Sequence, residues 1–289
     1  MSTDAPTGPA PMNPATPPIA TDAARRAVGA LLREVAHAQI VPRARAPGAR
    51  LKDDGSWVTD ADLAMQRQLQ AELAARWPTI ALLGEEMRED HQHELLRVET
   101  AAPDGAGLWV LDPLDGTSNF AAGLPAFGPS LAWLQGGRVR AGWVYDVMRG
   151  ELFSAVEGGG AWLGDTPLQV PARSRALRQA LACVDFKRLD AALAARLATR
   201  PPYASQRAIG SVALEWCWVA AGRFDIYLHG AQGLWDYAAG LLILHEAGGR
   251  SRTLDGDAVF VHELQRRSAL CAGDPALLDA WAAWLTAAR

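Results

Sequence analysis

The sequence has few of the features that mark secreted or membrane proteins. Its 289 residues include three cysteines, Cys183, Cys217 and Cys271, which lie far apart and form no C-x-x-C pair. We therefore expect neither a disulfide framework nor a structural zinc site, and we interpret the thiols as reduced core residues. No apolar run approaches the roughly 20 residues of a membrane-spanning helix, and the first residues lack the pattern of a secretory signal. These absences predict a soluble, cytoplasmic protein that does not associate with membranes.

An excess of positive charge is also missing. Lys and Arg total 28 against 32 Asp and Glu, which gives a formal net charge of −4 at pH 7. We therefore expect no direct binding to nucleic acid. Hydrophobic residues make up 49% of the chain and charged residues 21%, as in an ordinary globular enzyme. The length suits one large layered domain.

Composition divides the chain into a tail and a domain. Residues 1–20 are rich in Pro, Ala and Thr and have almost nothing to bury, which predicts a disordered tail. Residues 21–289 carry alternating helix and strand patterns without a break in composition. We interpret them as a single domain in two halves, an α+β half at about 21–170 and an α/β half at about 171–289.

Periodicity of the apolar residues predicts the elements of this domain. Helices are expected at 22–41, 60–77, 189–198, 212–221 and 236–247 and from 276 onward. Strands are expected at 80–83, 108–111, 130–134, 138–147, 151–156 and 224–228, and a short extended stretch at 56–59. The polar segment 86–107 is interpreted as a surface excursion with one helical turn.

The strongest chemical signal is the run WVLDPLDGTSNF. An apolar strand delivers Asp112 at its end, Pro113 turns the chain, and Asp115 follows three residues later. Two carboxylates this close repel each other unless a cation neutralises them. A hard divalent ion such as Mg²⁺ prefers such oxygen ligands. Gly116 and Thr117 then offer backbone N–H groups at an expected helix start, where a phosphate can bind.

Two weaker signals supply further carboxylates. Glu85 and Glu86 follow the strand expected at 80–83, and alone they would be a solvated charge pair. Asp236 stands at an expected helix start, and alone it would be an N-cap. Together with the aspartate pair they predict a site for more than one metal ion.

These segments resemble the inositol monophosphatase family, within the lithium-sensitive, magnesium-dependent phosphatase superfamily. The similarity covers roughly residues 22–275 and is strongest at 109–120 and 235–249. It implies an α+β fold, a five-layered αβαβα sandwich of the inositol monophosphatase and fructose-1,6-bisphosphatase type, whose first half binds the metal. It also implies lithium sensitivity and a homodimer.

The resemblance further implies Mg²⁺-dependent hydrolysis of a small phosphate monoester by metal-activated water. The implied metal ligands are Glu85, Asp112, the main-chain carbonyl of Leu114, Asp115 and Asp236. Thr117, together with Glu85, would orient and deprotonate the water, and Asp60 would support Thr117. The backbone of Gly116 and Thr117 would hold the phosphate. The organic part of the substrate would face Gly210, Ser211, Val212 and His229.

His229 departs from the inositol-specific pattern, in which a glutamate seven residues before the helix-start aspartate binds ring hydroxyls. Imidazole is neutral or cationic near neutral pH, so it cannot replace an anionic acceptor. The substrate is therefore left open among inositol monophosphate, a related polyol or sugar phosphate, a 3′(2′),5′-bisphosphate nucleotide and histidinol phosphate. Ser118-Asn119-Phe120, in place of Lys-Glu-Phe, favours the inositol branch over the nucleotidases. A non-catalytic alternative is a protein-interaction role associated with transcription.

Overall fold

A computed structural model of the chain describes residues 19–52, 55–173 and 175–287. The tail expected at 1–20 lies almost entirely outside the described residues. Ile19, near its end, is buried in the core beside the first helix. Within the described ranges, no helix combines the length and the apolar character needed to cross a membrane.

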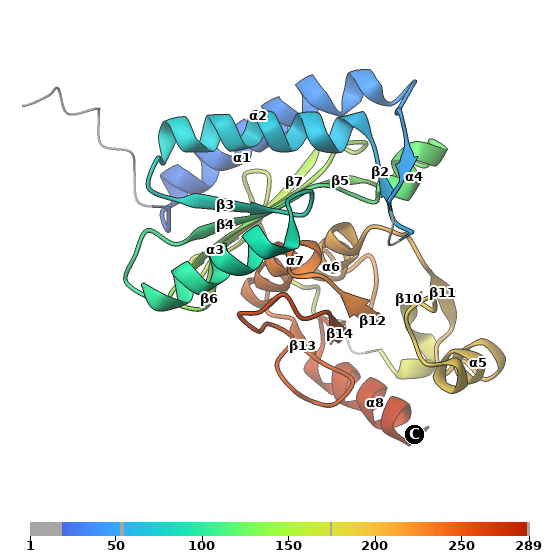
Figure 1. Cartoon of the computed structure of the whole chain (residues 1–289). Helices are drawn as coiled ribbons and strands as arrows, with labels where there is room; N and C mark the ends of the chain where they lie inside the picture. The colour runs from blue at the N-terminus through green and yellow to red at the C-terminus, as the bar shows by residue number, and fades with distance from the viewer. Residues whose placement is uncertain (1–18, 53–54, 174, 288–289) are drawn as a thin grey trace, which may run out of the picture.

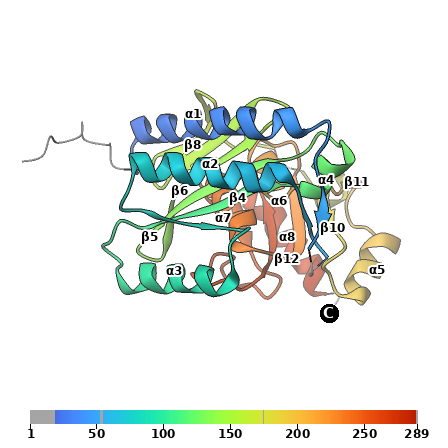
Figure 2. The ribbon, with the colours of Figure 1, turned by 45° about the horizontal axis from the view of Figure 1, so that its top comes forward.

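The domain is an α+β sandwich of five layers, as the resemblance implied (Figure 1). The first layer consists of α1 (Asp22–Gln39) and α2 (Asp60–Arg76), which run side by side over one face of the larger sheet (Figure 2). The apolar residues of α1 recur at helical spacing and are buried, Val28, Leu32 and Val35 among them. Each such side chain stabilises the fold by about 1.5–3 kcal/mol when it leaves water.

The second layer is a seven-stranded sheet in the order β3-β4-β5-β6-β7-β8-β9. β3 and β4 are parallel, and the remaining strands follow as an antiparallel meander. Its strands are β3 (Ala81–Gly84), β4 (Leu108–Asp115), β5 (Gly128–Gln135), β6 (Arg138–Asp146), β7 (Glu151–Val156), β8 (Gly160–Leu163) and β9 (Thr166–Leu168). A short helix, α4 (Thr117–Ala122), follows β4 directly.

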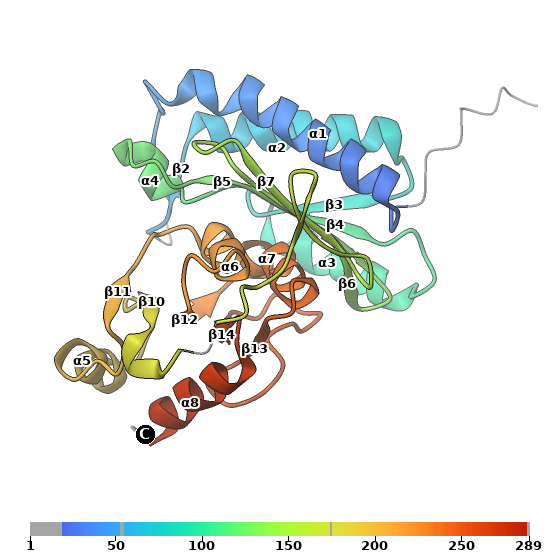
Figure 3. The same cartoon turned by 180° about the vertical axis from the view of Figure 1, so that it is seen from behind.

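The middle layer is formed by α6 (Val212–Ala220) and α7 (Leu234–Glu246), which pack between the two sheets (Figure 3). Eight of the nine residues of α6 are buried, which is typical of a helix enclosed on all sides. The two helices approach closely, because a Cβ added to Gly240 would lie 2.5 Å from the Cβ of Trp216. Close packing of this kind fixes α7 against α6.

The fourth layer is a five-stranded sheet in the order β11-β10-β12-β14-β13. β10 runs parallel to both β11 and β12, whereas β14 is antiparallel to its neighbours. Its strands are β10 (Leu181–Asp185), β11 (Ser205–Arg207), β12 (Ile226–Gln232), β13 (Arg250–Arg252) and β14 (Arg267–Ala272). The fifth layer holds α5 (Ala191–Thr199) and α8 (Pro275–Thr286), and the short elements are β1 (Arg50–Leu51), β2 (Trp57–Val58), η1 (Val41–Arg43) and η2 (Leu177–Gln179).

The prediction of a surface excursion at 86–107 is wrong. This segment contains α3 (Glu89–Ala101), a helix of 13 residues that lies against β3 and β4. Its buried positions are Gln92, Leu96 and Glu99, which share one face at helical spacing. Two of these three are polar, so a pattern of apolar residues could not reveal the helix.

The contact between Gly142 and α7 predicts an asymmetric response to the same substitution. A Cβ at Gly142 would lie 2.8 Å from Cα of Ala239, whose backbone cannot yield, whereas a Cβ at Gly29 in α1 would meet the flexible end of Leu152. Gly142→Ala should destabilise the fold by about 1–3 kcal/mol. Gly29→Ala should be neutral or stabilising by up to roughly 1 kcal/mol. Urea unfolding of both variants measures this difference, and equal effects would show that α7 can move away from the sheet.

Candidate functional site

Strand β4 carries two of the predicted carboxylates into the interior. All eight of its residues are buried, and Asp112 and Asp115 are 2% and 8% exposed. The strand does not end at Asp112 as expected but continues past Pro113 to Asp115. The pairing with β5 shifts register between the two aspartates, and such a bulge bends a strand and re-aims its side chains. A regular element therefore positions both acids.

Hydrogen bonds hold these two carboxylates. Oδ2 of Asp115 accepts from the Ser211 hydroxyl at 2.5 Å and from the backbone N–H of Ala213 at 2.7 Å. Oδ1 of Asp112 accepts from the backbone N–H of Leu114 at 2.9 Å. Ser211 and Ala213, at the start of α6, thus fix the orientation of Asp115, although they follow it by 96 and 98 positions in the sequence.

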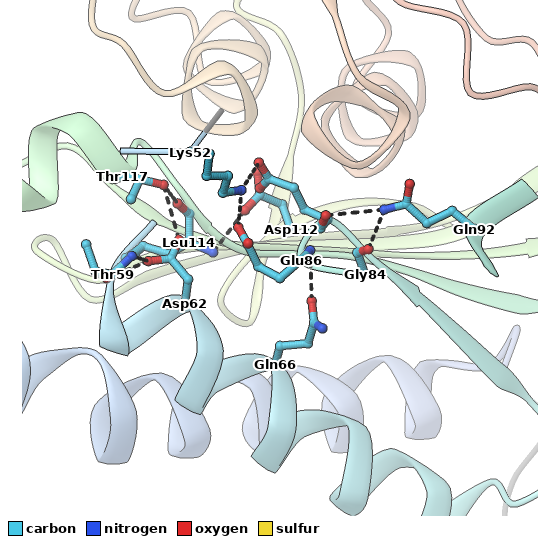
Figure 4. A network of polar contacts seen from close by, with 11 residues as sticks. Lys52, Thr59, Asp62, Gln66, Gly84, Glu86, Gln92, Asp112, Leu114 and Thr117 are labelled. Carbon is cyan, nitrogen blue, oxygen red and sulfur yellow. Dashed lines mark hydrogen bonds and ion pairs between the residues drawn. The ribbon is translucent and has the colours of Figure 1, made fainter. Parts of the chain in front are cut away.

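Glu85 reaches the same region from the end of β3. Its backbone N–H donates to the carbonyl of Leu111 at 3.0 Å and so extends the parallel pairing with β4. Nζ of Lys52 lies 3.5 Å from Oε1 of Glu85 and 2.6 Å from Oε1 of Glu86 (Figure 4). The pKa of Lys52 is raised: burial acts against this, and the charges of the two glutamates outweigh it. A cation of the chain itself therefore partly neutralises these acids.

Helix α3 supports the backbone that carries Glu85. The side-chain amide of Gln92 is buried and donates to the carbonyls of Gly84 at 2.7 Å and Glu85 at 3.2 Å (Figure 4). From α2, Oε1 of Gln66 accepts from the backbone N–H of Glu86 at 3.2 Å. Two helices on opposite faces of the sheet thus fix this strand end.

Asp236 enters from the first turn of α7. The N-cap of this helix is Gly233, so Asp236 is its third residue and not the cap that its sequence position suggested. Oδ2 of Asp236 accepts from the backbone N–H of Gly233 at 2.7 Å. The backbone carbonyl of Trp235 accepts from the hydroxyl of Ser130 on β5 at 3.1 Å, which ties this turn to the larger sheet.

Burial raises the pKa of all four carboxylates, and repulsion by neighbouring acids adds to this at three of them, Glu85, Asp112 and Asp115. The pKa of Glu85 is raised to about 8, mainly by burial; the charge of Lys52 acts against this, and the charges of Asp236 and Glu86 add to it. Burial likewise raises the pKa of Asp115 to about 8, with Asp236 as the largest neighbouring charge. Burial, Glu85 and Asp115 hold the pKa of Asp112 well above its usual range, and burial raises that of Asp236. Four acids in this state require protons or a cation.

The chemistry of these ligands suits a hard divalent cation, since every candidate atom is an oxygen. As the side chains stand, however, no group of three or more His, Cys, Asp or Glu in the described chain is arranged to hold a metal ion. The contacts above give the reason, because Glu85 faces Lys52 and Asp115 and Asp236 each direct one oxygen to backbone N–H groups. The side chains must turn toward a common point for an ion to bind.

Thr117 pairs with Asp62, so the prediction of Asp60 as its supporting acid is wrong. Oγ1 of Thr117 lies 3.2 Å from Oδ1 of Asp62 and 2.9 Å from the carbonyl of Leu114, and its proton can be donated to either (Figure 4). Asp62 is fully buried, and its Oδ2 accepts from both the backbone N–H and the hydroxyl of Thr59. Burial raises the pKa of Asp62 to about 6. Asp60 points outward, with its side chain 64% exposed near Arg50.

The predicted substrate-facing segment, residues 210–212, lies beside Gly116. A Cβ added to Gly116 would lie 3.2 Å from Cβ of Ser211, so the chain segments of the two residues are in contact. Gly210 has φ +81°, which favours glycine. Oε1 of the buried Glu215 accepts from the backbone N–H groups of Ile209 and Gly210 at 2.8 and 3.0 Å. Val212, the first residue of α6, follows directly.

His229 is buried, with 4% of its surface exposed, and both of its ring nitrogens are engaged within the protein. Nδ1 accepts from the backbone N–H of Ala231 at 3.2 Å, and Nε2 lies 3.3 Å from Oδ2 of Asp185. The ring therefore has no free polar atom for a substrate. This differs from the expected direct contact between His229 and the organic part of the substrate.

Sequence reasoning missed Lys52 and Asp62. Lys52 is one of only two lysines in a chain with 28 basic residues, and this rarity was a usable signal. Asp62 stands three residues after Thr59, the spacing of a capping box, which the structure shows. That spacing was visible in the sequence, but it indicates a helix start and not a contact with Thr117.

Comparisons with known proteins show which sequences and structures the chain is similar to. A model of the inositol monophosphatase family matches residues 16–287. The chain is 36% identical to an inositol-1-monophosphatase of Rhizobium meliloti over 71% of this chain and 75% of that protein. It is 33% identical to a Nus factor SuhB of Pseudomonas aeruginosa over 89% and 90% of the two chains. Its structure is similar to that of Mycobacterium tuberculosis SuhB, with a TM-score of 0.71, 32% identity and coverage of 92% and 96%.

The raised pKa values predict that Mg²⁺ stabilises the protein more at high pH than at low pH. An acid whose pKa is raised by folding favours the folded state at low pH, and this contribution is lost as pH rises from about 4 toward 8. A bound cation restores this stability fully only at a pH at which the acids are already ionised, because at lower pH the cation must displace their protons. At about 100 times its Kd, Mg²⁺ adds about 2.7 kcal/mol, or roughly 5–10 °C in Tm.

Thermal melts with and without MgCl₂, at about pH 8.5 and about pH 5.5 and constant ionic strength, measure this shift. Asp115→Asn is the control, because it keeps the size of the side chain and should abolish most of the shift at the higher pH. An equal shift in Tm at both pH values, or in wild type and variant, would show that Mg²⁺ binds elsewhere.

Proposed function

Because the chain belongs to the inositol monophosphatase family, whose members hydrolyse phosphate monoesters, we propose that it hydrolyses a small polyol or sugar phosphate, inositol monophosphate included, with Mg²⁺. The observation that carries this proposal is that four acids from three chain segments, Asp112 and Asp115 buried and the other two partly buried, lie close enough to one another to interact. They lie beside the Thr117–Asp62 pair. When bound, Mg²⁺ supplies positive charge that activates water and stabilises the leaving oxygen.

The residues that would hold the ion are those around the end of β4. Their oxygens come from the side chains of Glu85, Asp112, Asp115 and Asp236 and from the carbonyl of Leu114. The mutual repulsion of these acids supports the assignment, because an ion removes the cost that raises their pKa values. Lys52, which now lies beside Glu85, would keep its contact with Glu86.

Thr117 is proposed to orient the attacking water. Asp62 is fixed through one oxygen by Thr59, so its other oxygen is aimed at the hydroxyl of Thr117. A hydroxyl that donates its proton to this carboxylate has its lone pairs available to accept a proton from water. Since burial raises the pKa of Asp62 to about 6, the carboxylate form that this step requires prevails at neutral pH.

The backbone N–H groups of Gly116 and Thr117 are proposed to hold the phosphate. Gly116 has φ +84° and forms the N-cap of α4. A Cβ at this position would lie 2.7 Å from the carbonyl of Ala126, so only glycine allows the chain to turn here. This turn places the hydroxyl of Thr117 next to the carbonyl of Leu114 and within one residue of the proposed phosphate contact.

A transcription-associated interaction role is the second candidate, because a relative that matches 89% of the chain is named Nus factor SuhB. The acid cluster and the Thr117–Asp62 pair favour catalysis, since a docking surface requires neither. The two roles are compatible, and turnover by the purified protein separates the first from the second.

The direct test is turnover of a set of phosphate monoesters by the purified protein with and without Mg²⁺. The set contains inositol 1-phosphate, two sugar phosphates, an adenosine 3′,5′-bisphosphate and histidinol phosphate. We expect Mg²⁺-dependent release of phosphate with preference for the polyol or sugar esters. Turnover that is independent of Mg²⁺, or none with any ester, would contradict the proposal.

Asp62 and Asp60 provide a matched pair for the same assay. Asp62→Asn should lower kcat by roughly 10²- to 10⁴-fold, the range for loss of a positioned acid–base group, with little change in KM. Asp60→Asn removes the same charge two residues away and should leave kcat within about twofold, since surface substitutions are usually neutral. If Asp60→Asn were the damaging change, the assignment of Asp62 would be wrong.

A further inference from the structure

Two parallel strands of the smaller sheet end close to the acid cluster. β10 and β12 are neighbours, and Asp185, the last residue of β10, is the register partner of His229 on β12. In open α/β sheets, ligands bind beyond the carboxyl ends of such strands. The pairing of β12 with β14 is irregular between His229 and Gln232, just before α7 brings in Asp236. Bulges of this kind occur next to active sites.

The contacts of His229 fix the proton on one nitrogen. Nδ1 accepts from the backbone N–H of Ala231, so in the neutral ring Nε2 carries the proton and donates it to Oδ2 of Asp185 at 3.3 Å. The imidazole side chain is 6% exposed, whereas that of Asp185 is 27% exposed. The buried ring therefore holds the carboxylate from behind, and the carboxylate is the group that reaches the surface.

Asp185 keeps unused acceptor capacity. Its Oδ1 accepts from the backbone N–H of Lys187 at 2.7 Å and its Oδ2 from His229. A carboxylate has about four acceptor positions, so about two remain. The hydrogen bond from His229, with that from Lys187, holds the pKa of Asp185 below its ordinary value, so the group is an anion at neutral pH.

Arg188 brings a positive charge to the same edge. Its carbonyl packs against the end of β12, because a Cβ added to Gly230 would lie 1.8 Å from that oxygen. Arg188 is exposed, and its charge acts electrostatically on both Asp185 and Asp236. Arg266 also acts electrostatically on Asp236, so the strand ends present an anion and basic side chains beside an acid of the proposed metal site.

We propose that Asp185 is the specificity-determining residue for the organic part of the substrate, and that His229 is its positioning residue. The free acceptor sites of Asp185 bind hydroxyl groups of a neutral polyol attached to the phosphate. This inference rests on the proposed function and names the residue that selects the substrate class.

The presence of both charges favours hydroxyl groups. The anionic Asp185 would repel a second phosphate on the substrate, and Arg188 and Arg266 would repel an ammonium group. A hydroxyl both donates and accepts, so it can use the carboxylate and the guanidinium together. His229 has no carboxylate and need not contact the substrate, because Asp185 on the neighbouring strand β10 supplies the carboxylate.

Asp185→Asn tests the proposal through a ratio of two substrates. Inositol 1-phosphate has hydroxyl groups beside the ester, whereas 4-nitrophenyl phosphate has none. Asparagine keeps the size but loses the charge, so kcat/KM for inositol 1-phosphate should fall about 10- to 100-fold more than that for 4-nitrophenyl phosphate. Asp190→Asn is the matched control. Asp190 caps α5 from the same loop, and asparagine caps a helix equally well, so neither value should change.

A second pair of variants moves the carboxylate from one strand to the other. His229→Glu alone places two carboxylates side by side, and their repulsion should reduce selectivity for inositol 1-phosphate. Adding Asp185→Asn to His229→Glu removes that repulsion and should restore selectivity to within about tenfold of wild type. The double variant should therefore be the more selective of the two.

The outcomes separate this inference from the proposed function. If the wild-type protein hydrolyses neither ester, the proposed function itself is contradicted. If wild type hydrolyses both with Mg²⁺ and Asp185→Asn lowers both equally or neither, Asp185 does not select the substrate and the inference fails. It also fails if His229→Glu alone is as selective as the double variant.

Discussion

Repulsion among buried carboxylates at the end of β4 is the constraint on which the rest of the site depends. Asp112 and Asp115 are almost inaccessible to solvent, and burial with neighbouring charge raises the pKa of both. A protein can keep such a cluster only if the framework fixes it and something neutralises it. Lys52 offsets only a part of the negative charge. The cluster is therefore stable when it is protonated at low pH or when it binds a cation at higher pH.

The five layers supply the necessary rigidity. β3 and β4 are fixed by helices on both faces of the sheet, and α7 is packed so closely that a methyl group at Gly142 has no room. Acids that lie far apart in the sequence are thereby held close enough to interact, as Asp236 does with Glu85 and Asp115. The smaller sheet places Asp185 at the edge beside these acids. One framework therefore positions both the proposed metal ligands and the residue proposed to select the substrate.

Local patterns predicted the parts that depend on neighbours in sequence. Asp112 and Asp115 lie on one strand and Gly116 comes directly after it, so the sequence alone shows that these three residues are close together. Asp60 and Asp62 could not be told apart, because both stand in the first turn of α2 and only the packing shows which one faces Thr117. Helix α3 was missed because its buried face is mostly polar, and the Asp185–His229 pair joins two strands 44 residues apart. These features depend on contacts between residues that are distant in the sequence, so a local pattern could not predict them.

The most direct measurement is the number of protons released when Mg²⁺ binds. Calorimetric titration of metal-free protein in two buffers of different ionisation enthalpy gives this number at about pH 7. The account predicts release of at least one proton per protein, because Glu85 and Asp115 both have a pKa of about 8 and hold protons at that pH. The release should decline toward zero above about pH 9, where these groups are already ionised. Binding without proton release at neutral pH would contradict the claim that the cation neutralises this cluster.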